Sequence, residues 1–183
     1  MRKLIEATHV SLGGEVGNPE WAYPYLDEEH NRYARDLLAS ADALLLGRKT
    51  YEGLSAAYPP MESSAEGVFG EFVHRMNAIP KYVATTTLHD LNWNATPIEG
   101  DVVEFVRSLK EQPGQNIIKY GTGPLDRPLL ENKLVDEYHL WLTPVAVGVG
   151  QHLFEDVVGA PELRLLGLTQ FDSGVLVIRY GPK

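Results

Sequence analysis

The sequence has no cysteine, fewer basic than acidic residues and no long hydrophobic run. The lack of cysteine excludes disulfides, thiol catalysis and thiolate metal sites. The chain has 16 Lys and Arg residues against 25 Asp and Glu residues, which gives a formal net charge of -9. No basic stripe is therefore available to neutralise a nucleic-acid backbone, and we expect no nucleic-acid partner.

Membrane and export signals are also missing. No stretch approaches the roughly 20 apolar residues that a membrane-spanning helix requires, so we expect no membrane partner. Arg2 and Lys3 form a basic pair near the start, but Glu6 and His9 interrupt the apolar stretch that a signal peptide would need. These features predict a cytoplasmic protein.

The polar residues do not form the usual patterns of metal or hydrolytic sites. The six histidines are scattered without metal-ligand spacing, and we expect no metal. The serines lie outside any nucleophile-elbow pattern, which argues against a Ser/His/Asp hydrolase. A small anionic ligand is still compatible with the acidic composition, because a helix N-terminus or one arginine can outweigh a diffuse negative field.

The first two thirds of the chain alternate between β-type and helical patterns. Strands are expected at 3–11, 43–46, 81–86 and 116–120. Helices are expected at about 26–41, from 49 to the prolines at 59 and 60, at 68–76, after Asp101 and from about 124. This alternation favours crossover units in a mainly parallel sheet, and 58–64 is the one loop in which we expect disorder.

The last third changes character. Segments 135–145, 163–171 and 175–180 have strand patterns with no helix between them, and Ser173 and Gly174 predict a tight hairpin. We therefore expect one α/β domain, residues 1–183, with a mainly parallel central sheet and antiparallel C-terminal strands. Exposed strand edges are usually paired or covered. Tyr138, Leu140 and Leu142 alternate with residues that would face a partner, and this pattern predicts a homodimer.

Two junctions carry the strongest functional signal. At residues 44–51, LLLGRKTY, a buried strand turns through a glycine into a helix N-terminus beside Arg48 and Lys49. Free backbone N–H groups at such a point bind anions. Residues 121–125, GTGPL, repeat the arrangement, and their glycines allow a ligand close to the backbone. Together the junctions suit the phosphates of a dinucleotide.

A simpler interpretation of each junction remains open. Taken singly, each glycine could serve only a tight strand-to-helix turn. The Rossmann fingerprint does not decide the question, because Asp126 stands where its third glycine should be.

Several segments of the sequence resemble those of a known family. The segment at 47–51, GRKTY, is similar to the cofactor-binding turn of dihydrofolate reductases and of the pyrimidine reductase (RibD C-terminal) domain of riboflavin biosynthesis. Strand 81–86, GTGPL at 121–125, LVDE at 134–137 and PVAVGVGQHLF at 144–154 resemble that domain in order and spacing. The resemblance covers nearly the whole chain and implies the three-layer dihydrofolate-reductase-like fold.

The resemblance implies NADPH as the cofactor. Segments 47–50 and 85–87 would surround the adenosine phosphates, 121–125 the pyrophosphate, and the backbone near 8–10 the nicotinamide. The implied cofactor-binding residues are Thr8, His9, Val10, Gly47, Arg48, Lys49, Thr50, Thr85, Thr86, Thr87, Gly121, Thr122, Gly123, Pro124 and Leu125.

At two positions the acidic residues of related proteins need separate comparison with this chain. Many members of the group have Ser-Leu-Asp-Gly after the first strand, whereas this chain has Gly13 at the aspartate position. Dihydrofolate reductases carry an acidic residue at the start of the first helix, and Asp27 with Trp21 stands in a comparable relation, which makes Asp27 a catalytic candidate. The simpler alternative for Asp27 is that the helix dipole favours an acidic first turn.

The sequence thus predicts an NADPH-dependent reductase that transfers a hydride to a small heterocycle. Its expected partner is a small-molecule substrate of pyrimidine or pterin type, as in 5-amino-6-(5-phosphoribosylamino)uracil reductase. The alternative from another class is a non-catalytic NADP(H)-binding or sensor protein, which Gly13 favours.

Overall fold

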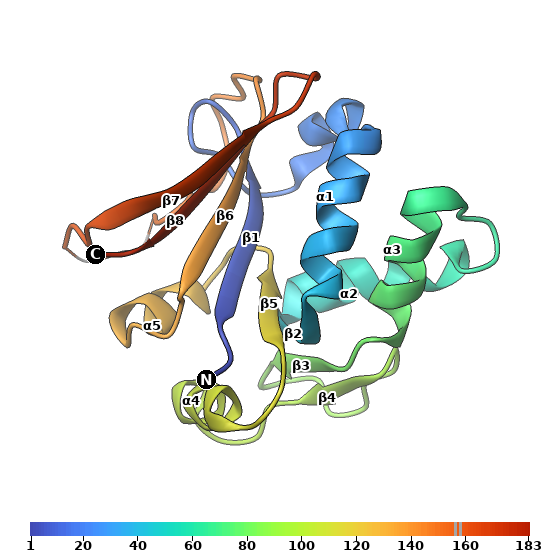
Figure 1. Cartoon of the computed structure of the whole chain (residues 1–183). Coiled ribbons are helices and arrows are strands. Elements are labelled where there is room, and N and C mark those ends of the chain that lie inside the picture. The colour runs from blue at the N-terminus through green and yellow to red at the C-terminus, as the bar shows by residue number, and fades with distance from the viewer. Residues whose placement is uncertain (156, 158) are drawn as a thin grey trace.

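The computed structural model describes residues 1–155, 157 and 159–183. Eight strands form one sheet in the order β4-β3-β2-β5-β1-β6-β8-β7 (Figure 1). The strands are β1 (Leu4–Val10), β2 (Ala41–Gly47), β3 (Lys81–Ala84), β4 (Ala95–Pro97), β5 (Asn116–Tyr120), β6 (Glu137–Leu142), β7 (Leu163–Gln170) and β8 (Leu176–Pro182). β1 to β6 pair in parallel, and β8 pairs antiparallel with both β6 and β7, which confirms the expected sheet.

Helices cover both faces of the sheet and make three layers. The helices are α1 (Glu28–Ala39), α2 (Arg48–Ala57), α3 (Gly67–Ala78), α4 (Val102–Glu111) and α5 (Asp126–Glu131), with 3-10 helices η1 (Pro19–Tyr25) and η2 (Pro59–Met61). Figure 1 shows α1, α2 and α3 on one side of the sheet and α4 and α5 on the other. Two buried clusters follow this division, one with α1 and α3 and one with α4 and α5.

The central strands are buried on both faces because their sequences are apolar without interruption. Leu44 and Leu46 of β2 pack toward α1 and α3, whereas Leu45 packs toward α4 and α5. All three side chains have no exposed surface. Continuous apolar strands of this kind are typical of parallel sheets covered by helices.

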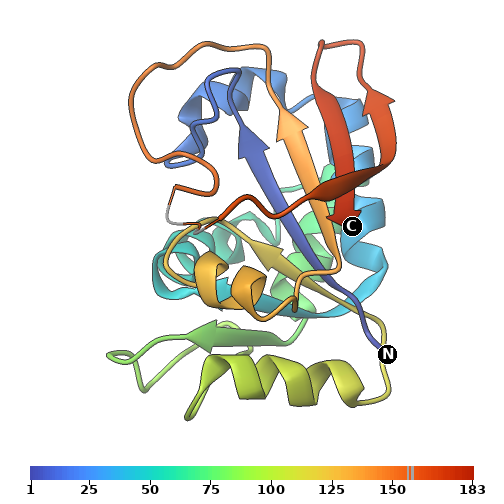
Figure 2. The same cartoon turned by 90° about the vertical axis from the view of Figure 1, so that its left-hand side faces the viewer.

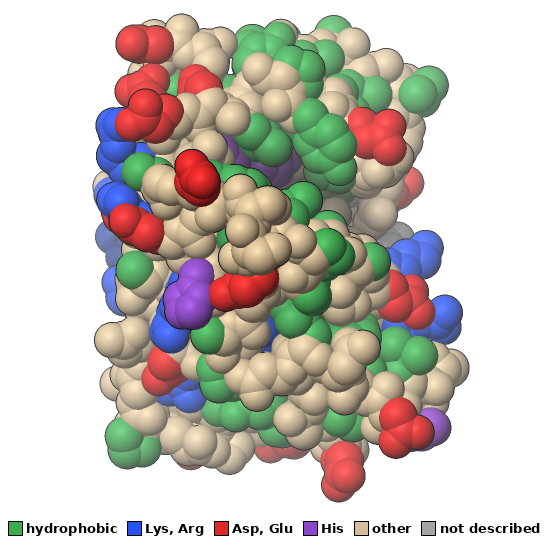
Figure 3. Space-filling view, turned by 90° about the vertical axis from the view of Figure 1, so that its right-hand side faces the viewer, with side chains coloured by type: hydrophobic (Ala, Val, Ile, Leu, Met, Phe, Trp, Pro, Cys, Tyr) green, Lys and Arg blue, Asp and Glu red, His purple; other side chains and the backbone are tan. Residues whose placement is uncertain are grey.

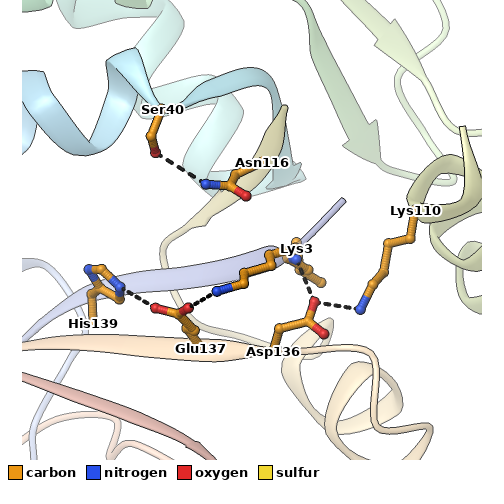
Figure 4. Close-up of polar contacts among 8 residues, drawn as sticks. Lys3, Ser40, Lys110, Asn116, Asp136, Glu137 and His139 are labelled. Carbon is orange, nitrogen blue, oxygen red and sulfur yellow. Dashed lines mark hydrogen bonds and ion pairs between the residues drawn. The ribbon is translucent and has the colours of Figure 1, made fainter. Parts of the chain in front are cut away.

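Polar side chains fix the amino ends of the strands. Asp136 accepts hydrogen bonds from the Leu4 N–H at 2.7 Å and from Lys110 Nζ at 2.5 Å (Figure 4). Glu137 accepts from Lys3 Nζ at 2.6 Å and lies 3.2 Å from His139 Nε2. These contacts join β1, α4 and β6 at the edge of the sheet opposite to the glycine junctions.

The structure corrects two expectations. The segment 58–64 is ordered as η2 and turns, because Glu62 binds His74 Nδ1 at 2.6 Å and the Asn77 amide of α3. The strand β4 was not expected, since it has three residues and contains a proline. Pro97 is tolerated there because β4 is an edge strand.

The basis for the homodimer prediction also changes. β6 lies between β1 and β8, and its alternate residues His139 and Trp141 are buried. The exposed edge is instead β7, where Leu165 and Leu168 are 61% and 58% exposed. The hairpin through Ser173 and Gly174 is confirmed, and Gly174 has a φ of 88°.

Candidate functional site

The predicted cofactor segments meet at the carboxyl edge of the parallel strands. Segments 85–87, 47–50 and 121–125 follow the neighbouring strands β3, β2 and β5, and 8–10 ends β1 beside them. In Figure 2 the arrowheads of β1 (blue) and β5 (yellow) lie above α5. Ligands of open α/β sheets bind at this edge, where the strand order reverses.

Residues 8–10 extend beyond the neighbouring strand β5. The β1–β5 ladder ends at the pair Ala7–Tyr120, whereas the β1–β6 ladder continues to Val10–Leu142. One backbone edge of Thr8, His9 and Val10 is therefore outside the strand pairing that the structure describes. This unpaired backbone edge lies on the β5 side of β1, beyond the point where the 121–125 segment begins.

Gly47 caps α2 without restricting access to it. Its φ of -76° and ψ of 161° suit any residue, and a Cβ built there would meet no heavy atom of the described chain within 4 Å. No side chain of the described residues caps the helix. The fold does not require glycine here, and its absence of a side chain leaves the first N–H groups of α2 open to an anion.

Gly121 brings the second junction against the first. Its φ is +73°, and a Cβ added to it would overlap Thr50 Oγ1 in the first turn of α2. The two glycine junctions are therefore in contact and form one site. Gly121 is therefore also required for packing. Its replacement by valine would disturb the fold as well as the binding of any ligand.

Arg48 connects two of the predicted segments. Its guanidinium lies 3.0 Å from Glu52 Oε1 and donates to Thr87 Oγ1 at 3.2 Å, while half of the side chain is exposed. Thr85 Oγ1 accepts from the N–H groups of Thr87 and Leu88 and shapes this turn. Arg48 thus pairs with a surface carboxylate and also lies beside the 85–87 turn.

A buried charged cluster beneath the 121–123 loop was missed by the sequence reasoning. Lys119 pairs with Asp126 and lies 3.6 Å from Glu6 Oε2, and both Glu6 and Lys119 are 1% exposed. Burial raises the pKa of Glu6 to about 7, against the lowering effect of Lys119. Charged residues inside otherwise apolar strands were the signal that could have identified this cluster.

Aromatic and imidazole rings fill the other face of the sheet at the same edge. His9 stacks on His30 at 5.2 Å between ring centroids, and Trp141 contacts both rings edge-on at 4.6 Å. Burial, with His30 next to it, lowers the pKa of His9 to about 3, so His9 is neutral. The space-filling view shows histidine atoms at the floor of a hollow (Figure 3).

Polar atoms of this ring cluster lack hydrogen bonds. Within the described residues, His9 Nδ1, His30 Nε2 and Trp141 Nε1 are buried without a hydrogen-bond partner. A buried polar atom costs free energy unless it finds a partner, and such groups gather at functional sites. These unpaired atoms mark the buried ring cluster as part of the candidate site.

Asp27 takes the role of a helix cap. It is the N-cap of α1 and accepts a hydrogen bond from the His30 N–H at 2.8 Å. That contact fits the helix-dipole alternative. A catalytic role for Asp27 stays a prediction.

A neighbouring carboxylate lies next to the position of the missing one at residue 13. A Cβ built on Gly13 would lie 2.5 Å and 2.6 Å from the two carboxylate oxygens of Glu15. Glu15 is buried, accepts from Ser11 Oγ and from the Gly148 N–H, and lies 3.7 Å from His152 Nε2. The Ser11 hydrogen bond lowers the pKa of Glu15, so the loop keeps an ionised carboxylate.

Other surfaces offer less chemistry. A cavity of about 620 Å³ lies between α5 and the start of β7, lined by Leu130, Lys133, Val135 and Leu163 among others, and no predicted site residue is among its described lining. No group of three His, Asp or Glu side chains in the described chain could hold a metal ion. None of the described helices is long and apolar enough to cross a membrane.

Comparisons with known proteins agree with this geometry. The chain is 29% identical over 180 residues to the protein YyaP of Bacillus subtilis (strain 168), covering 98% of this chain and 94% of that protein. The deaminase/5-amino-6-(5-phosphoribosylamino)uracil reductase of Thermotoga maritima matches with a TM-score of 0.68 and 12% identity, over 100% of this chain and 57% of that one.

Dihydrofolate reductase of Schistosoma mansoni matches with a TM-score of 0.65 and 12% identity, over 100% of this chain and 99% of that chain. These structural likenesses confirm the dihydrofolate-reductase-like fold. The model of the RibD C-terminal domain matches residues 2–177, and the chain therefore belongs to the RibD C-terminal domain family.

Proposed function

We propose that this protein is an NADPH-dependent reductase that transfers a hydride to a small heterocycle of pyrimidine or pterin type. The observation that carries the proposal is the single site formed by the α2 N-terminus, the 121–125 segment and the unpaired edge of residues 8–10. Family membership and the reductases among the structural neighbours support it. We also propose that the protein acts in the cytoplasm.

The residues present fit the cofactor. The N–H groups at the start of α2 and the loop glycines suit its phosphates, and Arg48 suits a phosphate on its adenosine. NADPH, when bound, supplies the hydride, and the protein sets its position relative to the substrate. The chain's contribution is to hold both molecules at the carboxyl edge and to exclude water.

His30 and Trp141 are buried, so the half-buried His9 is the ring of this cluster that the substrate would contact. Because His9 is neutral, it favours a neutral ligand over an anionic one at this point.

The alternative function is a non-catalytic NADP(H)-binding or sensor protein. It rested on Gly13, yet Glu15 places a carboxylate at the start of the missing side chain. We infer that Glu15 holds the loop after β1 against the 148–152 segment, as a positioning residue.

Titration with NADPH followed by steady-state NADPH oxidation tests the proposal. We expect binding, and turnover with at least one member of a panel of uracils and pterins, tested with and without a ribosyl phosphate. Binding without turnover on any member would favour the sensor, and failure to bind NADPH would contradict both.

A further inference from the structure

The 121–123 loop is held by the buried charged cluster of Glu6, Lys119 and Asp126. Lys119 Nζ donates to the Gly121 carbonyl at 2.5 Å, and Asp126 Oδ2 accepts from the Gly123 N–H at 2.8 Å. Lys119 also pairs with Asp126 itself. Both ends of the loop are thus attached to charged groups of one cluster.

The cluster is short of positive charge. It holds two carboxyl groups and one ammonium, and the nearer carboxylate oxygen of Glu6 lies 3.6 Å from Lys119, beyond hydrogen-bond distance. Glu6 Oε1 and the hydroxyl of the neighbouring Tyr138 are buried and have no hydrogen-bond partner within the part of the chain that is described. A buried carboxylate with one distant partner is costly in its ionised form, and protonation relieves that cost.

Three groups face Glu6 from the elements packed around it. Lys119 is its cross-strand neighbour on β5, Tyr138 is its neighbour on β6, and Asp126 reaches it from α5. Burial and Asp126 raise the pKa of Glu6 and Lys119 lowers it, with a result of about 7. Glu6 is therefore partly protonated near neutral pH.

We propose that the Glu6–Lys119–Asp126 cluster positions the 121–123 loop for a phosphorylated ligand, and that ligand binding there is coupled to the uptake of a proton by Glu6. The inference rests on the proposed NADPH site. An anion on the loop adds negative charge beside a cluster that already has one negative charge in excess. Protonation of Glu6 removes that excess, and the proton comes from the solvent.

The direction of the pH dependence follows. A bound anion favours the neutral carboxyl and raises the pKa of Glu6 above its value in the free protein. Binding is then strongest below the free-state pKa and weakens as the pH rises through the pKa of the complex. If ligand binding raises the pKa of Glu6 by about one unit, the Kd rises about tenfold as the pH passes from below the free-state pKa to above the pKa of the complex. About half a proton is then taken up near pH 7.

The proton count can be measured directly. Isothermal titration of NADPH at pH 7.0–7.5, in buffers of low and high ionisation enthalpy, gives the number of protons bound per ligand. We expect the wild type to take up protons when it binds NADPH. E6Q should take up about half a proton less, because Gln keeps the shape of Glu6 and cannot titrate. Uptake by other groups, including the NADPH phosphate, cancels in this comparison.

A second variant gives a result that a purely structural role would not produce. D126N keeps an oxygen to accept the Gly123 N–H but removes the charge that raises the pKa of Glu6. The midpoint of the proton uptake should therefore move to lower pH. Circular dichroism and thermal melting establish that both variants are folded.

The outcomes separate the two proposals. Equal proton uptake by the wild type and E6Q, with NADPH bound by both, would overturn this inference and leave the proposed function standing. An unmoved midpoint in D126N would also overturn it. Failure of the wild type to bind NADPH would overturn the proposed function and this inference with it.

Discussion

Arg48 holds its guanidinium between Glu52 and Thr87, next to the open N-terminus of α2. The exposed pair with Glu52 contributes little to stability, as exposed i,i+4 pairs generally do. A guanidinium can instead bind a phosphate through two parallel hydrogen bonds, which lysine cannot copy. The position therefore suits recognition of the 2′-phosphate that distinguishes NADPH from NADH.

We predict that Arg48→Ala weakens NADPH binding and scarcely affects NADH. A charge-assisted hydrogen bond contributes about 1.5–3 kcal/mol, which corresponds to a loss of roughly 10- to 100-fold. Isothermal titration of both cofactors measures it. Arg32→Ala is the matched control, because Arg32 forms an i,i+4 pair with Glu28 and is equally exposed. An equal loss of affinity for both cofactors would indicate that Arg48 contacts the pyrophosphate. No loss for either cofactor would indicate that Arg48 forms only its surface ion pair.

Sequence reasoning at this scale recognised residues whose neighbours along the chain carry the signal. Gly47 and Arg48 stand at a strand-to-helix junction that is visible in the sequence. Glu6 and Lys119 were overlooked because they are 113 positions apart and become neighbours only through the β1–β5 register. The approach of the Glu15 carboxylate to position 13 likewise depends on a loop conformation that no local pattern predicts.

At the scale of elements, the stability of α2 and the proposed anion binding at its start have different requirements. The helix would gain from a capping side chain at position 47, whereas an anionic ligand needs the same N–H groups. Glycine is the residue that leaves these groups open. Stability and binding should therefore respond in opposite directions to a capping substitution.

We predict this opposition for Gly47→Asp. The backbone conformation accepts a side chain, and an aspartate cap should stabilise α2 by about a few tenths of a kcal/mol. Its carboxylate would occupy the N–H groups and repel phosphates, so NADPH binding should fall by at least about tenfold. Thermal melting and NADPH titration measure the two effects.

Gly47→Asn is the matched control, because Asn caps as well as Asp and carries no charge. It should raise the stability similarly and weaken NADPH less than the aspartate does. If the Asp and Asn variants bind NADPH as well as the wild type does, the α2 N-terminus does not contact the cofactor.

The elements themselves were largely predictable, and the failures have local causes. β5 was expected within its observed bounds, since a short apolar run between turn residues has few alternatives. β4 was missed because its three residues owe their strand conformation to pairing with β3. The 58–64 segment was expected to be disordered, since the side-chain contacts of Glu62 with α3 that hold it are not visible locally.

At the scale of the whole molecule, the two edges of the sheet differ. The β4 edge is three residues long and contains a proline, which blunts it against pairing. The β7 edge has eight residues and carries Leu165 and Leu168. A bulge between Leu165 and Gly167 places these leucines opposite Tyr180 and Ile178 of β8, on the same face of the sheet.

We predict that this face is covered in a homodimer. Sedimentation at micromolar concentration should give a dimer for the wild type and a monomer for Leu168→Lys, whose charge would be buried in the interface. Val149→Lys is the control, because Val149 is 77% exposed in another part of the surface. A wild-type monomer would contradict the prediction, and an unaffected Leu168→Lys dimer would place the interface elsewhere.

The sequence by itself determined the order of the strands and helices other than β4, the parallel core with its antiparallel end, and the two glycine junctions. Each of these depends on hydrophobic periodicity and turn residues, which act over a few positions. The tertiary structure decided how distant segments meet. It placed Gly121 against Thr50, ended β5 short of residues 8–10, and buried Glu6 beside Lys119. Strand register and burial set these contacts, and both belong to the folded chain as a whole.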